Sequence, residues 1–180
     1  MLKENLKVFL SSYNVPLEKW GAGEAKTVDH LCAELLLGES ILEVRGGVLT
    51  RVAEGSTLHV YHHDGENLWL LIEDKQIFKD GRERVRELET SIGEKMKRGE
   101  DSTEAAYRAL SEELGIKERL PLFPKPNILK GPIPSVSFPG IQSVYVMYVS
   151  DVFIPPHLYK KEGYVEHQAD KSSYFVWKKV

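Results

Sequence analysis

The segment GEDSTEAAYRALSEELGI, residues 99–116, constrains the fold more than any other part of this 180-residue chain. It opens with residue types that cap the N-terminus of a helix, Asp101, Ser102 and Thr103. Gly115 stands where a left-handed glycine commonly ends a helix. The spacing therefore predicts a helix over about 103–114, with an apolar stripe formed by Ala106, Leu110 and Leu114.

The hydrophobic pattern on both sides of this helix is that of β-strands. From residue 47 onward, alternation and β-branched or aromatic residues predict strands at 47–55, 56–63, 68–74 and 82–88. An Asp-Gly pair within HDGEN predicts a tight hairpin turn between the second and third of these. After the helix, a stretch rich in Pro, Gly and Ser at 122–143 predicts a loop, and strands are expected at 143–154 and 174–180.

Two further helices are expected near the N-terminus, over residues 2–11 and 27–37. In the second, apolar residues recur at helical spacing behind the candidate cap Thr27, and Gly38 is a plausible stop. Helices before and between strands predict an α/β (α+β) sandwich with a mixed sheet. We expect the chain to divide into an N-terminal helical extension, 1–40, and a domain formed by 41–180.

Charge and cysteine content exclude several classes of protein. The formal net charge is −3, which gives no reason to expect a nucleic-acid-binding surface, because such binding needs clustered Lys and Arg. The single cysteine, Cys32, cannot form an internal disulfide or a cysteine-based zinc site. No apolar run approaches the length of a membrane span. We therefore expect a cytoplasmic protein without nucleic-acid or membrane partners.

The helix at 103–114 places several carboxylates close together. Glu112 and Glu113 are about 100° apart around the axis, so both can contact one ion, and Arg108 lies one turn before Glu112. Glu100, in the preceding loop, can bend back towards the same ion. Hard oxygen ligands of this kind suit Mg²⁺ or Mn²⁺. The alternative is a surface helix whose charges are simply solvated.

The spacing of these residues resembles the box of the Nudix hydrolase superfamily. That pattern reads Gly, five residues, Glu, seven residues, then Arg-Glu-apolar-x-Glu-Glu-x-Gly-apolar. Aligned on EELGI, the matching positions are Glu100, Arg108, Leu110, Glu112, Glu113, Gly115 and Ile116. The resemblance covers about an eighth of the chain. It implies a Nudix α/β/α sandwich, metal ligation by Glu100, Glu112 and Glu113, and Mg²⁺ or Mn²⁺ as cofactor.

Two positions depart from the family pattern. The opening glycine of the box falls on Glu94, with Gly93 one residue earlier. The glutamate after the arginine, which in many members is a metal ligand or the general base, is Ala109. A carboxylate there would lie on the face of Glu112 and Glu113. A base could instead come from a later loop, for which Glu166 is the first choice ahead of Glu162, His167 and Asp170.

Substrate contacts are predicted from charge and aromatic character. Lys95, Lys97 and Arg98 precede Glu100 and could pair with phosphate groups. Phe138, with Tyr145 or Tyr148, could stack a base, although aromatic side chains in strands are more often core. The adjacent histidines His62 and His63 are expected to be exposed at the hairpin turn.

Two functions follow from these observations. The first is a metal-dependent hydrolase that cleaves a phosphoanhydride bond in a nucleoside diphosphate linked to another group, with Glu112, Glu113, Arg108 and Glu166 in its active site. The second is a catalytically weak or inactive Nudix-fold module that binds a nucleotide or a protein partner. Ala109 motivates the second function, and the remaining box residues motivate the first.

Overall fold

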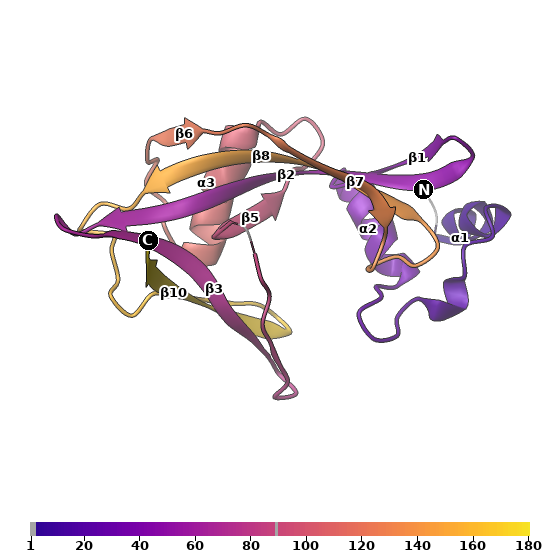
Figure 1. Ribbon diagram of the computed structural model, residues 1–180. Coiled ribbons are helices and arrows are strands. Elements are labelled where there is room, and N and C mark those ends of the chain that lie inside the picture. Colours follow the sequence, from indigo (N-terminus) through magenta and orange to yellow (C-terminus); the bar gives the residue numbers. More distant parts are fainter. Residues whose placement is uncertain (1–2, 89) are drawn as a thin grey trace. The chain divides into compact units, whose positions relative to one another are not determined.

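The computed structural model describes residues 3–88 and 90–180. Within these ranges the chain forms three α-helices and one ten-stranded sheet (Figure 1), so the predicted α/β fold is confirmed. The elements are α1 (Lys3–Ser12), η1 (Leu17–Lys19), α2 (Val28–Leu37), β1 (Ile41–Arg45), β2 (Val48–His63), β3 (Leu68–Phe78), β4 (Glu83–Arg84), β5 (Ile92–Lys95), α3 (Ser102–Leu114), β6 (Leu122–Pro124), β7 (Ile128–Pro134), β8 (Gln142–Phe153), β9 (Tyr164–His167) and β10 (Lys171–Lys179).

Six of the ten strands form one hydrogen-bonded path. Its order is β6-β8-β2-β3-β10-β9, while β1 and β5 pair with β2, β4 pairs with β3, and β7 pairs with β8. The chain divides into two compact units. The first comprises Met1–Gly55, Lys95–Glu100 and Ile128–Met147, and the second comprises Ser56–Glu94, Asp101–Asn127 and Tyr148–Val180. The long strands β2 and β8 contribute residues to both.

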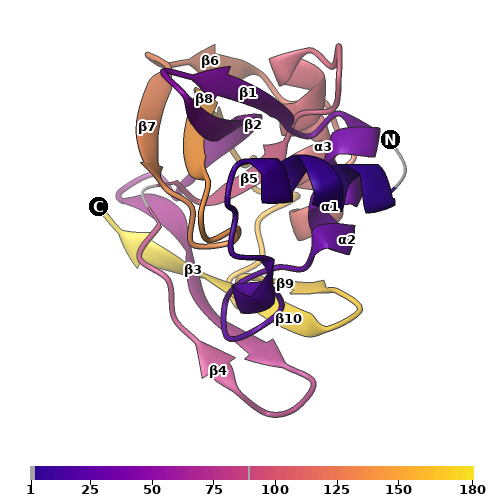
Figure 2. The same ribbon diagram turned by 90° about the vertical axis from the view of Figure 1, so that its right-hand side faces the viewer.

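The first unit contains the predicted N-terminal helices. The α1 and α2 helices lie side by side (Figure 2). As the sequence predicted, Thr27 caps α2, where His30 completes a capping box, and Gly38 ends the helix with φ of 72°. Both helices pack on a core shared with β2 and the segment before β8: Leu6, Leu10, Val15, Val28, Leu31, Leu49, Phe138 and Ile141. The domain boundary expected at residue 40 stays a prediction. The first unit extends past that residue, because it also contains strands.

The second unit is built on α3. Its buried face packs against residues of β2, β3, β8 and β10, and β9 also contacts the helix. The predicted hairpin joins β2 to β3, with His63 opposite Leu68. Asp64 stabilises the turn, because its carboxylate accepts hydrogen bonds from the backbone N–H groups of Glu66 and Asn67 at 3.0 and 2.7 Å.

Several strand boundaries differ from the sequence-based expectation. The two strands predicted at 47–55 and 56–63 form one strand, β2, which continues through Gly55. The strand predicted at 82–88 is reduced to the two residues of β4. The short strands β1, β5, β6, β7 and β9 were not predicted. β5 pairs with β2 and β6 with β8, so partners distant in sequence supply their hydrogen bonds, whereas β1, β7 and β9 each pair with the strand that follows them in the chain.

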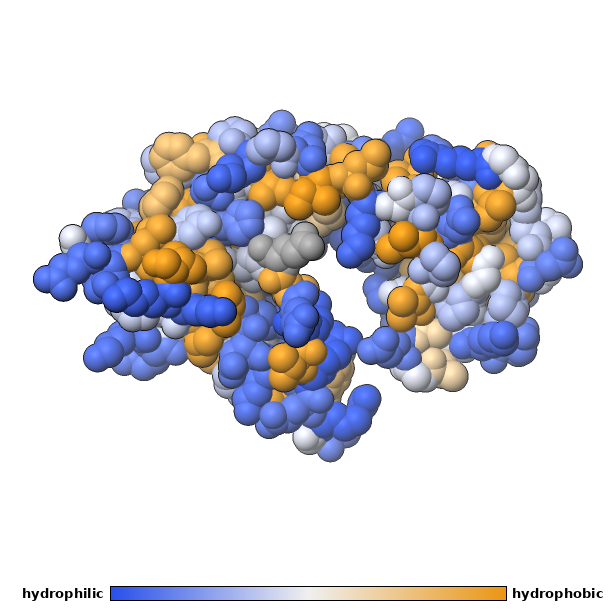
Figure 3. All heavy atoms as spheres, in the orientation of Figure 1, coloured by the Kyte–Doolittle hydropathy of each residue, from blue (hydrophilic) through white to orange (hydrophobic). Residues whose placement is uncertain are grey.

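Hydrophobic residues also reach the surface. Figure 3 shows apolar residues in separate patches among polar ones. In the second unit, Phe123 of β6 and Phe153 of β8 are among the exposed apolar side chains. Scattered apolar exposure of this kind is normal for a folded protein. Among the described residues, no helix is long and apolar enough to cross a membrane.

Candidate functional site

The box carboxylates lie at the C-terminal end of α3. The helix starts where the sequence predicted, because the Asp101 carboxylate accepts a hydrogen bond from the Thr103 N–H at 2.8 Å. Gly115 ends it with φ of 70°. The helix buries a face formed by Ala105, Ala106, Ala109, Leu110 and Leu114. Glu112 is consequently exposed and Glu113 is half-buried at the margin of the core.

Arg108 links the acidic end of the helix to strand β5. Its Nη1 atom lies 3.3 Å from Oε1 of Glu94 and 3.9 Å from Oε2 of Glu112. Glu104, one turn before Arg108 on the helix, forms a bidentate pair with Arg119 at 2.7 and 2.6 Å. Arg108 is therefore placed to hold the helix against the strand that enters the box.

Glu113 is the most perturbed carboxylate near the helix. Its Oε1 accepts a hydrogen bond from the Gly93 N–H at 3.1 Å, which ties it to β5. Burial, together with the negative charges of Glu166, Glu94 and Glu73, raises the pKa of Glu113 to about 8. A side chain at position 93 would collide with Thr57, because an added Cβ would lie 2.7 Å from its Cγ2 atom. A glycine is therefore required where the box entry meets the helix.

Three residues of this neighbourhood were missed by the sequence-based analysis: Glu73, Arg86 and Glu94. Glu73 is buried on β3, and the Arg86 guanidinium forms a bidentate pair with its carboxylate. That hydrogen bond, with smaller contributions from Glu113 and Glu166, raises the pKa of Arg86. The available signal was a charged residue at a core-facing position of a strand, in LWLLIED.

Glu166, the predicted base, lies on β9 and is half-buried. Its carboxylate accepts a hydrogen bond from Nε2 of Gln168 at 2.7 Å, and its charge acts on Glu113. The structure therefore brings Glu166 near the box helix, although a stretch of more than fifty residues separates them in the sequence. The other loop candidates, Glu162, His167 and Asp170, are exposed.

The predicted residues of the box-entry loop belong to the first unit. Glu100 is held within its own loop, because its Oε2 accepts a hydrogen bond from the Lys97 N–H at 2.8 Å. Lys95 contacts the buried carboxylate of Glu34, and Arg98 is exposed. A pocket of about 270 Å³ lies here, lined by Gly38, Glu39, Ser40, Ile41, Val52, Glu54, Met96, Lys97, Arg98, Gly99 and Glu100.

Three expectations about individual side chains are corrected. Phe138 is fully buried beside Trp20, with ring centroids 5.1 Å apart, so it is a core residue and not a platform for a substrate base. His62 is buried rather than exposed, with its ring stacked on Tyr159. Ala109 is fully buried in the core of the second unit. A glutamate at position 109 would enter this core and would not simply join Glu112 and Glu113.

The residues near Glu113 suit a hard divalent cation. The donors are carboxylates, and ionised Glu113 is destabilised by its neighbours, which a bound cation would relieve. Across residues 3–88 and 90–180, no three His, Cys, Asp or Glu side chains are already arranged as a ligand set. Metal binding would thus require these carboxylates to close around the ion.

The sequence matches no protein-family model and no curated protein. Several solved structures resemble part of this chain. The dihydroneopterin triphosphate pyrophosphohydrolase of E. coli is 17% identical over 69% of this chain and 78% of its own, with a TM-score of 0.45. A MutT/nudix family protein from Enterococcus faecalis is 14% identical over 87% of this chain and 52% of its own, with a TM-score of 0.45. The Ap4A hydrolase of C. elegans is 14% identical over 71% of this chain and 80% of its own, with a TM-score of 0.40.

Strand β5, the Glu100 loop and the capped helix α3 follow one another along the chain, and the box residues Arg108, Glu112 and Glu113 occupy their expected places on that helix. The order and spacing of these residues on an α/β fold resemble those of the Nudix box.

Proposed function

We propose that the protein is a divalent-metal-dependent hydrolase acting on a nucleoside diphosphate linked to another group. The observation that carries this proposal is the geometry at the end of the box helix, where Arg108 bridges Glu112 and Glu94 and the carboxylate of Glu113 accepts a hydrogen bond from the Gly93 N–H of β5. Half-buried carboxylates that destabilise one another are costly to a fold without a compensating role. A cation that also contacts substrate phosphates would supply that role.

Each residue has a distinct part in the proposed reaction. Glu112 and Glu113 would hold Mg²⁺ or Mn²⁺, which would polarise a phosphoryl oxygen and lower the pKa of bound water. Arg108 keeps the helix carboxylates against β5. Glu166 would accept the proton of the attacking water. Arg98, exposed in the box-entry loop, would pair with a substrate phosphate.

Turnover of a substrate panel tests the proposal directly. Purified protein would be incubated with ADP-ribose, dinucleoside polyphosphates, oxidised nucleotides and NADH, in Mg²⁺ or Mn²⁺. We expect release of a nucleoside monophosphate or phosphate from at least one compound. No product at high enzyme concentration with either metal would refute the hydrolase.

The role of Glu166 has its own test. Glu166→Gln should lower kcat by about 10²- to 10⁴-fold, the usual contribution of a general base. The matched control is Glu118→Gln, because Glu118 is an exposed glutamate whose partner is His157. If Glu166→Gln retained full turnover, the base would have to be sought elsewhere.

A second function is favoured by Ala109. Ala109 is fully buried and supplies no carboxylate at the position that, in many members of the family it resembles, carries a catalytic or metal-binding glutamate. The alternative is a module that binds a nucleotide or a protein partner without turning it over. Such a module would show ligand-dependent rises in melting temperature without product, because a ligand that binds only the folded state stabilises it.

A further inference from the structure

A row of polar side chains crosses β9, β10, β3 and β4 in the second unit, where these strands are neighbours (Figure 2). Glu166 of β9 lies opposite Ser173 of β10. Ser173 lies opposite Gln76 of β3, and Gln76 lies opposite Arg84 of β4. Residues directly opposite one another in antiparallel strands point to the same face of a sheet, so the four side chains share one face. Phe175, two residues after Ser173, packs in a core with residues of α3, so this is the face that α3 covers.

The middle of the row is buried and hydrogen-bonded. Gln76 and Ser173 are each 1% exposed, and Nε2 of Gln76 donates to Oγ of Ser173 at 3.2 Å. The same nitrogen donates to Oε2 of Glu73 at 3.0 Å. Oε1 of Gln76 accepts hydrogen bonds from Nε and Nη2 of Arg84 at 3.1 and 2.6 Å. The Arg84 guanidinium is therefore held in one orientation, but its partner is a neutral amide.

Three carboxylates of β3 and the β3–β4 hairpin pair with cations other than Arg84. These pairs are Glu73 with Arg86, Asp80 with Arg82, and Glu83 with Lys75. Across residues 3–88 and 90–180, no carboxylate forms an ion pair with Arg84 or with Lys171. Both side chains are half-buried, so each charge is partly withdrawn from water without a counter-charge beside it.

Lys171 brings a second cation to the same face. It lies two residues before Ser173 on β10, so the two side chains point to the same side of the sheet. Burial and the positive charges of Arg86 and Arg84 lower the pKa of Lys171. The negative charge of the neighbouring Asp170 opposes this change without cancelling it. Ionised Lys171 is therefore destabilised in the folded protein.

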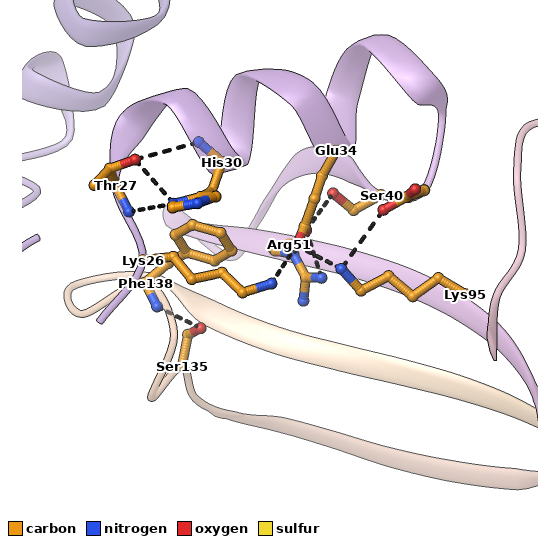
Figure 4. A network of polar contacts seen from close by, with 10 residues as sticks. Lys26, Thr27, His30, Glu34, Ser40, Arg51, Lys95, Ser135 and Phe138 are labelled. Carbon is orange, nitrogen blue, oxygen red and sulfur yellow. Dashed lines mark hydrogen bonds and ion pairs between the residues drawn. The ribbon is translucent and has the colours of Figure 1, made fainter. Parts of the chain in front are cut away.

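The buried cations of the first unit are arranged differently (Figure 4). Lys26, Arg51 and Lys95 all donate hydrogen bonds to the carboxylate of one residue, Glu34, which is 5% exposed. Burial alone would raise the pKa of Glu34, but these cations lower it to about 2. The fold thus supplies a counter-charge to the cations around Glu34. For Arg84 and Lys171, a counter-charge can come from a bound anion.

We propose that Arg84 and Lys171 form a binding site for a phosphate group on the face of the sheet that α3 covers. Arg84 offers a guanidinium that Gln76 orients, and Lys171 offers N–H donors that have no hydrogen-bond partner among the described residues. Phosphate oxygens accept charge-assisted hydrogen bonds from both groups. The identification of this phosphate as part of the substrate rests on the proposed hydrolase function, whereas phosphate binding itself does not.

The distance from Glu166 indicates which part of a substrate this site would bind. Glu166 and Arg84 stand at opposite ends of the row, three strand spacings apart. Because neighbouring strands are separated by 4.7–4.9 Å, the two backbones are roughly 14 Å apart. A phosphate at Arg84 and Lys171 would thus lie away from the phosphorus that is attacked. We expect the site to affect KM more than kcat.

The chain offers a matched pair of variants to test the site. Lys171→Met removes one cation from it. Lys75→Met makes the same change on β3, but Lys75 is the neighbour of Gln76 and therefore points to the opposite face of the sheet. Arg84→Gln removes the second cation and keeps a side chain that can donate to Gln76.

Calorimetric titration with pyrophosphate is the first measurement. A chelator is present, so that bound metal does not contribute. We expect the wild-type protein to bind, and the affinity to fall about tenfold or more in Lys171→Met and in Arg84→Gln, as for the loss of one charged hydrogen bond. Lys75→Met should bind like the wild type. An absence of binding by the wild type, or an equal loss in Lys75→Met, would overturn the site.

Thermal unfolding separates a binding residue from a structural one. In the ligand-free protein, Lys171→Met should raise the melting temperature by about 2 °C, because it removes a half-buried charge that Arg86 and Arg84 destabilise. Pyrophosphate should raise the melting temperature of the wild type but not that of Lys171→Met. If Lys171→Met lowered the melting temperature and retained the response to pyrophosphate, Lys171 would be structural and the proposal would be wrong.

Turnover distinguishes failure of this site from failure of the hydrolase. If the substrate panel gave no product while pyrophosphate bound the wild type and not Lys171→Met, the phosphate site would stand without the hydrolase. If a substrate were cleaved, Lys171→Met should raise its KM about tenfold, with kcat changed less than about twofold. An unchanged KM would leave the hydrolase intact and would refute the binding of substrate phosphate by Lys171.

Discussion

Glu34 and Glu113 show how one residue type acquires opposite properties from its surroundings. Both lose water on folding, but Glu34 meets Lys95, Arg51 and Lys26, while Glu113 meets other glutamates. The pKa of Glu34 therefore falls to about 2 and that of Glu113 rises to about 8. Neither outcome could be anticipated from the sequence, because the deciding partners come from distant segments.

The lowered pKa of Glu34 predicts a stability change in acid. A glutamate titrates near 4.5 when unfolded and, here, near 2 when folded, so its contribution is present above pH 4.5 and is lost as the pH falls towards 2. The contribution is about 3 kcal/mol, taken as an order of magnitude at 1.36 kcal/mol for each unit of pKa. Urea unfolding between pH 5 and pH 2 measures it.

Glu34→Gln is the control for that titration. The variant should be less stable at pH 7, because it leaves the buried Arg51 without its carboxylate, and should lose stability less steeply on acidification. An identical pH dependence in wild type and variant would show that other carboxylates govern acid unfolding.

Burial of Ala109 predicts the effect of restoring the family glutamate. Ala109→Glu should lower the free energy of unfolding by about 3 kcal/mol or more, since the carboxylate would enter a core without a partner. Ala33→Glu is the matched control, because Ala33 is exposed on α2, and its effect should be within about 0.5 kcal/mol. A stable Ala109→Glu variant with raised turnover would instead show that the core opens at this position.

At the scale of elements, helices α2 and α3 end in the same way but differ in what surrounds the end. Gly38 and Gly115 both adopt left-handed conformations, with φ of 72° and 70°. Around Gly115 an added Cβ would meet no atom within 4 Å, whereas at Gly38 it would meet Arg98. Helix ends were predictable because caps and glycine stops are local signals. The contact between Gly38 and Arg98 could not be predicted, because it joins segments distant in sequence.

This difference yields a prediction for the two glycines. Gly115→Ala should cost about 1 kcal/mol, the strain of a left-handed alanine. Gly38→Ala should cost measurably more, because the same strain is added to a collision with the loop at Arg98. Chemical denaturation of the two variants compares them. Equal losses would mean that the loop moves away at little cost.

At the scale of the whole molecule, the acidic neighbourhood of Glu113 is assembled from β3, β5, α3 and β9 within the second unit. Millimolar Mg²⁺ or Mn²⁺ should raise the melting temperature, because a cation relieves the repulsion among these carboxylates. Glu112→Gln/Glu113→Gln should raise the melting temperature without metal and abolish the metal response. Thermal unfolding with each metal and with a chelator measures both effects.

Glu118→Gln is again the control, and it should keep the full metal response. If neither cation nor the chelator changed the melting temperature of the wild-type protein, both the metal site and the proposed hydrolase would be contradicted. A metal response retained in the double variant would place the cation elsewhere.

The sequence alone determined the helices, their caps, the β2–β3 hairpin and the register of the box, because these depend on residues within a few positions of one another. The strands β5 and β6 required their partners, since their hydrogen bonds come from β2 and β8, which are distant in sequence. Only the tertiary structure decided that Ala109 and Phe138 are core residues. It also decided that the charges of Glu73 and Glu94 act on Glu113, and that Lys95 donates a hydrogen bond to Glu34. Burial and the electrostatic field at a side chain are sums over the packed molecule, and local pattern does not contain them.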